Sequence, residues 1–142
     1  MLKTIIRASE NFCIHQIRVS HSVSDVINKK RTLIAYIDIQ TIEPKKFRIY
    51  LASDLGFMQR ISKVFLEEDE SDEETLIDMT LETTNLIIGS AKVLAQSTGE
   101  SFTIATPCFG KIDIFDFDFD DAKSIKIDSD EMVIAIKEIK IG

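Results

Sequence analysis

Residues 78–92 read Asp78-Met-Thr-Leu-Glu82-Thr-Thr-Asn85-Leu-Ile-Ile-Gly89-Ser-Ala-Lys92 and belong to a long helical pattern. At 100° per residue, the polar groups of this helix fall on one narrow stripe. The stripe consists of Asp78, Glu82, Asn85, Gly89, Lys92 and Gln96. The side facing away from it is apolar, with Leu76, Leu81, Ile87, Ile88, Ala91, Leu94 and Ala95. Such a stripe is either a functional site or the solvent-facing side of an ordinary amphipathic helix.

Two residues favour a functional site over an ordinary solvent-facing side of the helix. Glycine inside a helix costs about 1 kcal/mol relative to alanine, so Gly89 predicts that another group approaches the helix closely there. Asparagine is a poor helix former because its side chain competes for backbone hydrogen bonds, so Asn85 is an unusual choice for solubility alone. We therefore take the Asp78/Glu82/Asn85 row of this stripe as the candidate site.

Working outward, the spacing of apolar residues predicts two further helices and a sheet. Residues 2–16 form the first helix, and the second begins at Ser53 or Asp54 with an apolar stripe that reaches Phe65. Alternating or β-branched runs bounded by turn residues predict the strands. These strands are 19–23, 32–40, 46–52, 101–106, 111–118, 124–127 and 132–139. Helices on one side of a mostly antiparallel sheet make an α+β, two-layer fold.

The limits of the long helix are predicted from capping residues. An acidic stretch, Glu67 to Glu74, is a solvated connector between the second and third helices. Within it, Ser71 and Glu74 have the spacing of a capping box, which predicts that the third helix opens there. Gly99 suits the position just past its end.

Carboxylates at every second position from Phe115 to Asp121 raise the question of a metal site. An EF-hand loop needs glycine at its sixth place and a carboxylate at its twelfth, but Asp121 and Ile127 stand there. The alternation instead favours a strand with one buried face, with a bulge or break near Phe115. His15 and His21 have no common zinc spacing either, so we predict no metal site.

Composition narrows the class of protein. With 142 residues, 44% of them hydrophobic, the chain can bury one core, so residues 1–142 are expected to form a single domain. A net charge of −7 without a basic cluster argues against nucleic acid or an anionic membrane as partner. Cys13 and Cys108 set no disulfide framework, and we find neither a signal peptide nor a membrane span. We therefore expect a soluble, cytoplasmic protein.

The pattern Asp78-x3-Glu82-x2-Asn85-x21-Pro107 resembles the signature of the CheC/CheX/FliY phosphatases of bacterial chemotaxis. The resemblance is closest to CheX, because CheC-type members carry a second copy of the motif in the first helix. Here the position three after Glu10 is Cys13, which breaks the motif. The resemblance implies a CheX-like fold with the motif helix and the N-terminal helix packed on the sheet.

The resemblance also implies a function: hydrolysis of the aspartyl phosphate of a CheY-like response-regulator receiver domain in chemotaxis signalling. Asn85 would position the attacking water and Glu82 would dock to the receiver lysine, while Asp78 and Gly89 would contact the partner. No cofactor is expected on this chain, because the Mg²⁺ belongs to the receiver. CheX-like proteins are dimers, which predicts a homodimer.

Two alternatives remain open at this point. One is a non-catalytic module of the same fold that binds a receiver or a flagellar-switch protein. The other is a dimerising scaffold, for which the strand Met132–Ile139 would offer a sheet edge for pairing with a second chain.

Overall fold

The computed structural model describes residues 1–140 and has a helix or strand that overlaps each predicted one, with different bounds at several of them. The helices are α1 (Leu2–Phe12), continued by a π-helical turn η1 (Cys13–Ile17), then α2 (Leu55–Leu66) and α3 (Glu73–Ser97). The strands are β1 (Ser22–Ser24), β2 (Arg31–Thr41), β3 (Lys46–Asp54), β4 (Phe102–Ile104), β5 (Cys108–Ile114), β6 (Asp121–Ile127) and β7 (Asp130–Ile139).

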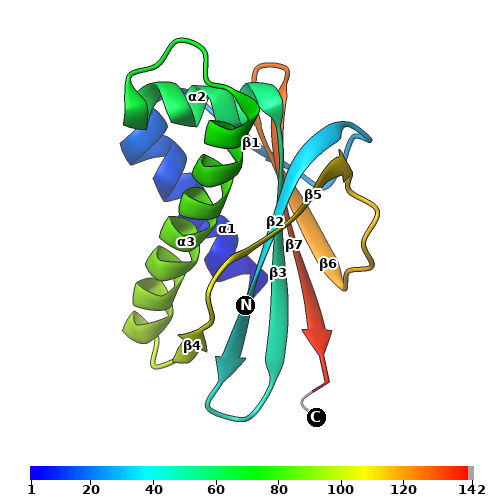
Figure 1. Cartoon of the computed structure of the whole chain (residues 1–142). Helices are drawn as coiled ribbons and strands as arrows, with labels where there is room; N and C mark the ends of the chain where they lie inside the picture. The colour runs from blue at the N-terminus through cyan, green and yellow to red at the C-terminus, as the bar shows by residue number, and fades with distance from the viewer. Residues whose placement is uncertain (141–142) are drawn as a thin grey trace.

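The strands form one sheet in the order β1-β6-β7-β3-β2-β4, with β5 beside β4 on the same flank of β2. Every pairing is antiparallel. The helices all cover one face of the sheet, and α1 and α3 lie side by side on it (Figure 1). The predicted α+β, two-layer fold is therefore confirmed.

The prediction that Met132–Ile139 offers a sheet edge is wrong. This segment belongs to β7, which pairs with β3 on one side and with β6 on the other. Its β-branched residues therefore mark an interior strand that is covered on both faces, as Val133, Ile134 and Ile136 are buried.

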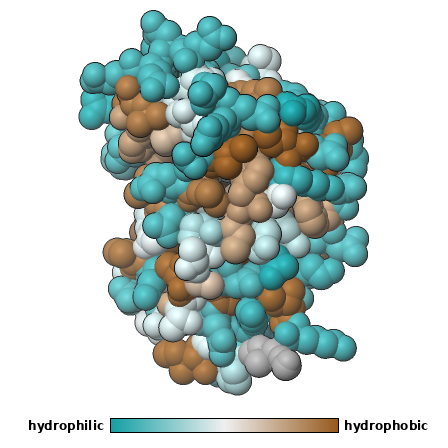
Figure 2. Space-filling model, viewed as in Figure 1, coloured by the Kyte–Doolittle hydropathy of each residue, from teal (hydrophilic) through white to brown (hydrophobic). Residues whose placement is uncertain are grey.

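The main core lies between the helices and the inner face of the sheet. It is built from Ile5 and Phe12 of α1, Phe57 and Ile61 of α2, Ile87 and Ala91 of α3, and inward residues of the central strands. Outside this core, apolar surface appears only in separate patches among hydrophilic side chains on the face shown in Figure 2.

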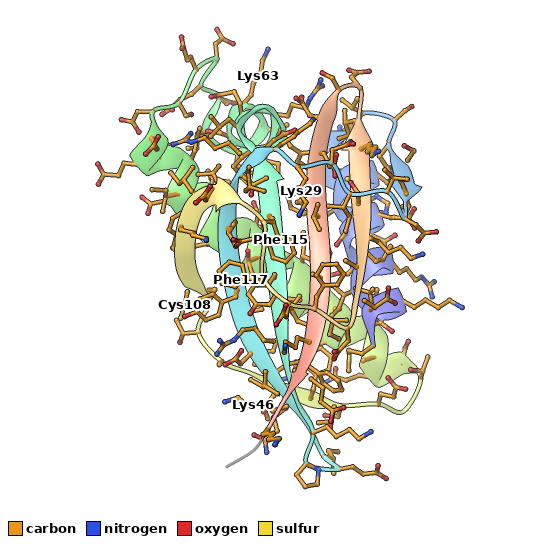
Figure 3. All side chains as sticks on the ribbon, turned by 90° about the vertical axis from the view of Figure 1, so that its right-hand side faces the viewer. Lys29, Lys46, Lys63, Cys108, Phe115 and Phe117 are labelled. Atoms are coloured by element: carbon orange, nitrogen blue, oxygen red, sulfur yellow. The ribbon has the colours of Figure 1, made fainter. Side chains whose placement is uncertain are left out.

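A second, smaller core lies on the outer face of the sheet. Phe115 and Phe117 lie over this face (Figure 3), and both rings pack on Tyr50, with centroids 5.5 and 4.9 Å away. The expected break near Phe115 is confirmed, but the expected strand over 115–118 is wrong, because β5 ends at Ile114. Phe115 and Phe117 still share one buried side, as the alternation predicts, but the segment packs its rings against the sheet without pairing with a strand.

The register shift in β5 has a local cause. Ile34 of β2 pairs with Lys111, while its neighbour Ala35 pairs with Phe109, so Gly110 is the extra residue of a β-bulge. A Cβ atom at Gly110 would lie 3.3 Å from the carbonyl oxygen of Ile34, a tight contact that glycine avoids.

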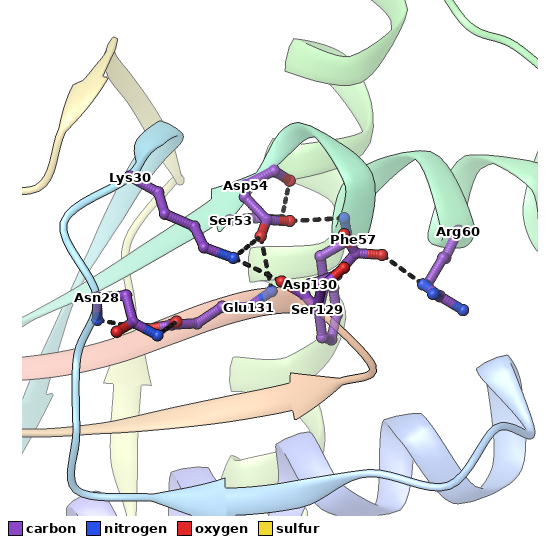
Figure 4. Close-up of polar contacts among 9 residues, drawn as sticks. All are labelled: Asn28, Lys30, Ser53, Asp54, Phe57, Arg60, Ser129, Asp130 and Glu131. Carbon is purple, nitrogen blue, oxygen red and sulfur yellow. Dashed lines mark hydrogen bonds and ion pairs between the residues drawn. The ribbon is translucent and has the colours of Figure 1, made fainter.

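A polar network fixes the start of α2 at the upper end of the sheet (Figure 4). The Asp54 carboxylate caps the helix by accepting from the Phe57 N–H at 2.7 Å. Its other oxygen accepts from the Glu131 N–H at 2.8 Å and from Lys30 Nζ at 3.1 Å. The Glu131 carboxylate in turn accepts from the backbone and side-chain nitrogens of Asn28, at 3.1 and 2.8 Å. These buried polar groups are paired with one another, as a structural network requires.

The two cysteines differ in environment, and this predicts their reactivity. Cys13 is buried, and its burial, with the nearby Glu10 charge, raises the pKa of its thiol to about 11, whereas Cys108 is exposed on β5. Since the thiolate is the reactive form, a thiol reagent at pH 8 is expected to label one cysteine per native chain and two after denaturation. A Cys108→Ser variant should show no rapid labelling in the native state, and rapid labelling of it would contradict the assignment.

Candidate functional site

The motif helix α3 begins one residue later than its capping box predicts. Asp72 is the N-cap, and its carboxylate accepts from the Thr75 N–H at 2.8 Å. This N–H holds the pKa of Asp72 below its ordinary value. The predicted Ser71–Glu74 capping box is wrong, because Ser71 is buried and its hydroxyl contacts Ser62 and donates to Glu68.

The helix ends where the sequence predicts. Gly99 follows the C-cap residue Thr98 and has a φ of +82°, the left-handed conformation that glycine adopts without steric cost. Its N–H donates to the Gln96 carbonyl at 3.1 Å, and the Glu100 N–H donates to Ala95 at 3.0 Å. The result is a capped helix of 25 residues that lies along the sheet as a rigid support.

The buried face of α3 contains polar residues that the hydrophobic pattern did not reveal. Thr80, Thr83 and Thr84 are buried beside the predicted apolar positions. The hydroxyl of Thr80 donates to the Leu76 carbonyl at 2.7 Å, and that of Thr84 donates to the Thr80 carbonyl at 2.8 Å. These bonds to the preceding turn satisfy the hydroxyls of Thr80 and Thr84, and the Thr83 hydroxyl donates to Met58 Sδ at 3.8 Å, so threonine can occupy the core side of the helix. The polar stripe is thereby left as the outward side.

The structure places the three polar residues of the candidate site on the exposed side of α3. Asp78, Glu82 and Asn85 are exposed. Among residues 1–140, none of their side chains makes a hydrogen bond or an ion pair. Residues three or four apart on a helix have Cβ atoms about 5–6 Å apart, so Glu82 and Asn85 project together from one spot. Both are therefore free to contact another molecule.

Gly89 completes the stripe one turn further along α3. A Cβ atom built there meets nothing within 4 Å, so the packing of the described residues does not require glycine at this position. It is partly exposed on the same side of the helix as Asn85.

The positions of Pro107 and Glu10 agree with a single copy of the motif, located on α3. Pro107 lies in the break between β4 and β5, directly before the first residue of β5. In the first helix, Glu10 is held by His21, with 3.1 Å between Oε1 and Nε2, and Cys13 is buried. The Glu82–Asn85 arrangement therefore has no counterpart at Glu10.

Within residues 1–140, no group of three or more His, Cys, Asp or Glu side chains is placed to hold a metal ion. In the segment from Phe115 to Asp121, Asp116 Oδ1 lies 3.3 Å from Lys111 Nζ, and the Asp120 carboxylate accepts from the Glu138 N–H at 2.7 Å. In the same described range, no helix has the length and apolar character needed to cross a membrane.

A protein-family model described as chemotaxis phosphatase CheX matches residues 39–127, more than half of the chain. The chain belongs to the CheX family. The matched region includes the end of β2, the strands β3, β4, β5 and β6, all of α2 and α3, and the complete motif from Asp78 to Pro107. A comparison with curated proteins found no match.

Solved structures show the same fold at low sequence identity. The chemotaxis protein CheX from Vibrio vulnificus has a TM-score of 0.78 and 17% identity, with 96% of this chain and 97% of that chain covered. A putative chemotaxis protein from Desulfovibrio vulgaris Hildenborough has a TM-score of 0.76 and 19% identity, with 97% and 96% covered. The CheX–CheY–BeF3–Mg²⁺ complex from Borrelia burgdorferi has a TM-score of 0.66 and 16% identity, with 96% and 97% covered.

Proposed function

We propose that this CheX-family chain is a phosphatase that hydrolyses the aspartyl phosphate of a CheY-like receiver domain in chemotaxis signalling. The observation that carries the proposal is the pair Glu82 and Asn85, exposed and without partners among residues 1–140, on a rigid helix. The family description and the complex of a CheX with CheY support the same class of partner.

The receiver itself supplies most of the groups that the reaction requires. In the reaction a water oxygen bonds to phosphorus, the bond from phosphorus to the aspartyl oxygen breaks, and inorganic phosphate and the free carboxylate result. The receiver's own Mg²⁺ and lysine neutralise the phosphoryl charge, so what remains to be supplied is a water held in line with the breaking bond. Positioning, rather than proton transfer, therefore provides the rate gain.

Asn85 suits the positioning of this water. A carboxamide both accepts and donates hydrogen bonds, so it can fix the orientation of a water molecule. It is also neutral, and so it brings no negative charge beside the phosphoryl oxygens. We assign the water-positioning role to Asn85.

The Glu82 side chain suits the docking of α3 to the receiver. A carboxylate would repel the phosphoryl group directly, but it can form a charge-assisted bond with the lysine of the receiver's active site. Because Glu82 lies one turn before Asn85, this bond would fix the position of α3 along the receiver. Asp78, a further turn away, is placed for a contact at the rim.

The decisive experiment is to mix the chain with a phosphorylated CheY-type receiver and Mg²⁺ and to follow the loss of phosphate. A phosphatase shortens the lifetime of the phosphoryl group at substoichiometric amounts. A non-catalytic module of the same fold, the second candidate, binds the receiver and leaves that lifetime unchanged.

Gly89 provides a test of the docking face that is independent of the chemistry. Replacing it with alanine should raise the free energy of unfolding by up to about 1 kcal/mol, because a Cβ atom has open space there and alanine favours the helix. If the receiver backbone approaches this turn, the same variant should bind the receiver more weakly. Denaturant unfolding and receiver titration measure the two effects, and unweakened binding would show that no close approach occurs at Gly89.

A further inference from the structure

A groove of about 250 Å³ lies between the helices on the face that α3 shares with α1 and the end of α2. We call it the helical groove; its walls include Phe12 of α1, His15 of η1, Phe65 of α2, and Leu86 and Ser90 of α3. The rings of Phe12 and Phe65 stack with centroids 5.9 Å apart and an angle of 14° between their planes. The groove thus combines aromatic and aliphatic walls with a few polar groups, the usual composition of a recognition pocket.

The helical groove is continuous with the candidate site. Leu86 directly follows Asn85 and stands one turn after Glu82, and Ser90 directly follows Gly89. Leu86 is 38% exposed and Phe65 is also 38% exposed, so the groove presents apolar surface to solvent. A partner that contacts Glu82 and Asn85 therefore also meets the wall formed by Leu86.

The helical groove adjoins an acidic stretch of the chain, because Phe65 comes just before Glu67 and Leu86 comes one turn after Glu82. Between Glu67 and Glu82 the chain has nine carboxylates and no lysine or arginine. Of these carboxylates, two have ion-pair partners among residues 1–140: Glu73 with Arg31 and Asp69 with Lys63, both at 3.7 Å. Figure 2 shows the hydrophilic side chains of the α2–α3 connection at the upper left, next to apolar surface over the end of α2.

This charge disfavours a second copy as the occupant. A second copy would carry a net charge of −7 and would bring an identical acidic stretch, so like charges would meet. A surface with basic side chains around an apolar one is complementary instead.

We infer that the helical groove is the place where the CheY-like receiver inserts an apolar side chain, surrounded by basic residues, next to its active site. The inference rests on the proposed function for the identity of the partner. In this arrangement, Glu82 and Asn85 enter the active site while the groove supplies the apolar part of the binding surface. The groove then contributes to affinity, and the motif contributes to the chemical step.

The test uses Leu86→Ser, with Ile42→Ser as the matched control, because Ile42 is 81% exposed in the β2–β3 turn, outside the groove. The probe is a CheY-type receiver saturated with BeF3⁻ and Mg²⁺, titrated by calorimetry. Leu86→Ser should weaken binding about tenfold, which corresponds to losing one well-buried anchor. In turnover, its KM for the phosphorylated receiver should rise by a similar factor while kcat stays within about twofold. Ile42→Ser should match the wild type.

A second variant distinguishes filling the groove from losing apolar surface. Ser90→Phe adds an apolar side chain at an exposed position that lines the groove, and it should weaken binding by blocking the cavity. Unchanged or tighter binding by Ser90→Phe overturns the inference, as does equal affinity of Leu86→Ser and the wild type. A change in the oligomeric state of the chain alone in Leu86→Ser also overturns it, in favour of a second copy. If the wild type binds the receiver without hydrolysis, the proposed function fails, while the titrations still decide the role of the groove.

Discussion

Replacing Asn85 with alanine is expected to slow receiver dephosphorylation by about 10²-fold or more, the scale for removing one preorganised polar group. The fold should survive, because the Asn85 side chain is exposed and makes no hydrogen bond among residues 1–140. Alanine is also the better helix former, so the free energy of unfolding should stay the same or rise slightly. Stopped-flow or discontinuous phosphate assays at saturating receiver measure the effect on kcat.

The matched control for this prediction is Gln96→Ala. Gln96 carries the same type of group on the same stripe of α3, is exposed, and lies three turns beyond Asn85. The Gln96→Ala variant should leave both kcat and KM unchanged. An Asn85→Ala protein that clears the phosphoreceiver at the wild-type rate would show that the water-positioning role is assigned to the wrong residue.

Reversing the charge of Glu82 is expected to weaken docking by about 30-fold or more. In Glu82→Lys, the proposed attraction to the receiver lysine becomes repulsion, and a like-charge contact of this kind costs about 2 kcal/mol or more, or about 30-fold in affinity. Glu82 is exposed, so the folded state should tolerate lysine. Titration with the BeF3⁻-bound receiver measures the loss directly, and the loss should become smaller as salt is added.

Two companion variants identify the cause of the Glu82→Lys effect. Glu82→Gln removes the attraction without adding repulsion, so its affinity should lie between those of the wild type and Glu82→Lys. Glu100→Lys makes the same change of net charge at an exposed position beyond the end of α3 and should bind normally. Equal losses in Glu82→Lys and Glu100→Lys would mean that overall charge, rather than a local pair, governs binding.

Most of the fold could be predicted from the sequence because local signals and burial agree along the chain. Helix and strand periodicities, the Asp54 start of α2 and the glycine after α3 each follow from the residues concerned. The exposed Glu82–Asn85 stripe could be predicted for the same reason, since the apolar side of α3 leaves only one side free.

The predictions were wrong where two local structures fit the sequence equally well and tertiary packing determined which one forms. Ser71 and Asp72 are both good N-cap residues, but the buried contacts of Ser71 leave the capping role to Asp72. The alternating Phe and Asp residues from Phe115 fit a strand, but Tyr50 on the outer face of the sheet gives the rings a packing surface instead. The helical groove was missed because its walls come from segments that are distant in the sequence.

The isolation of Glu82 and Asn85 from the rest of the chain has an evolutionary consequence. Since neither side chain makes a hydrogen bond or an ion pair among residues 1–140, helix-compatible substitutions there should change stability little, and under the proposed roles they would act mainly on signalling. Under the proposed function, a lineage could lose the phosphatase activity and keep an intact binding surface for the same receiver, with hardly any change in backbone. Similarity of fold alone will therefore not separate catalytically active family members from inactive ones. The residues that correspond to Glu82 and Asn85 must be examined in each sequence.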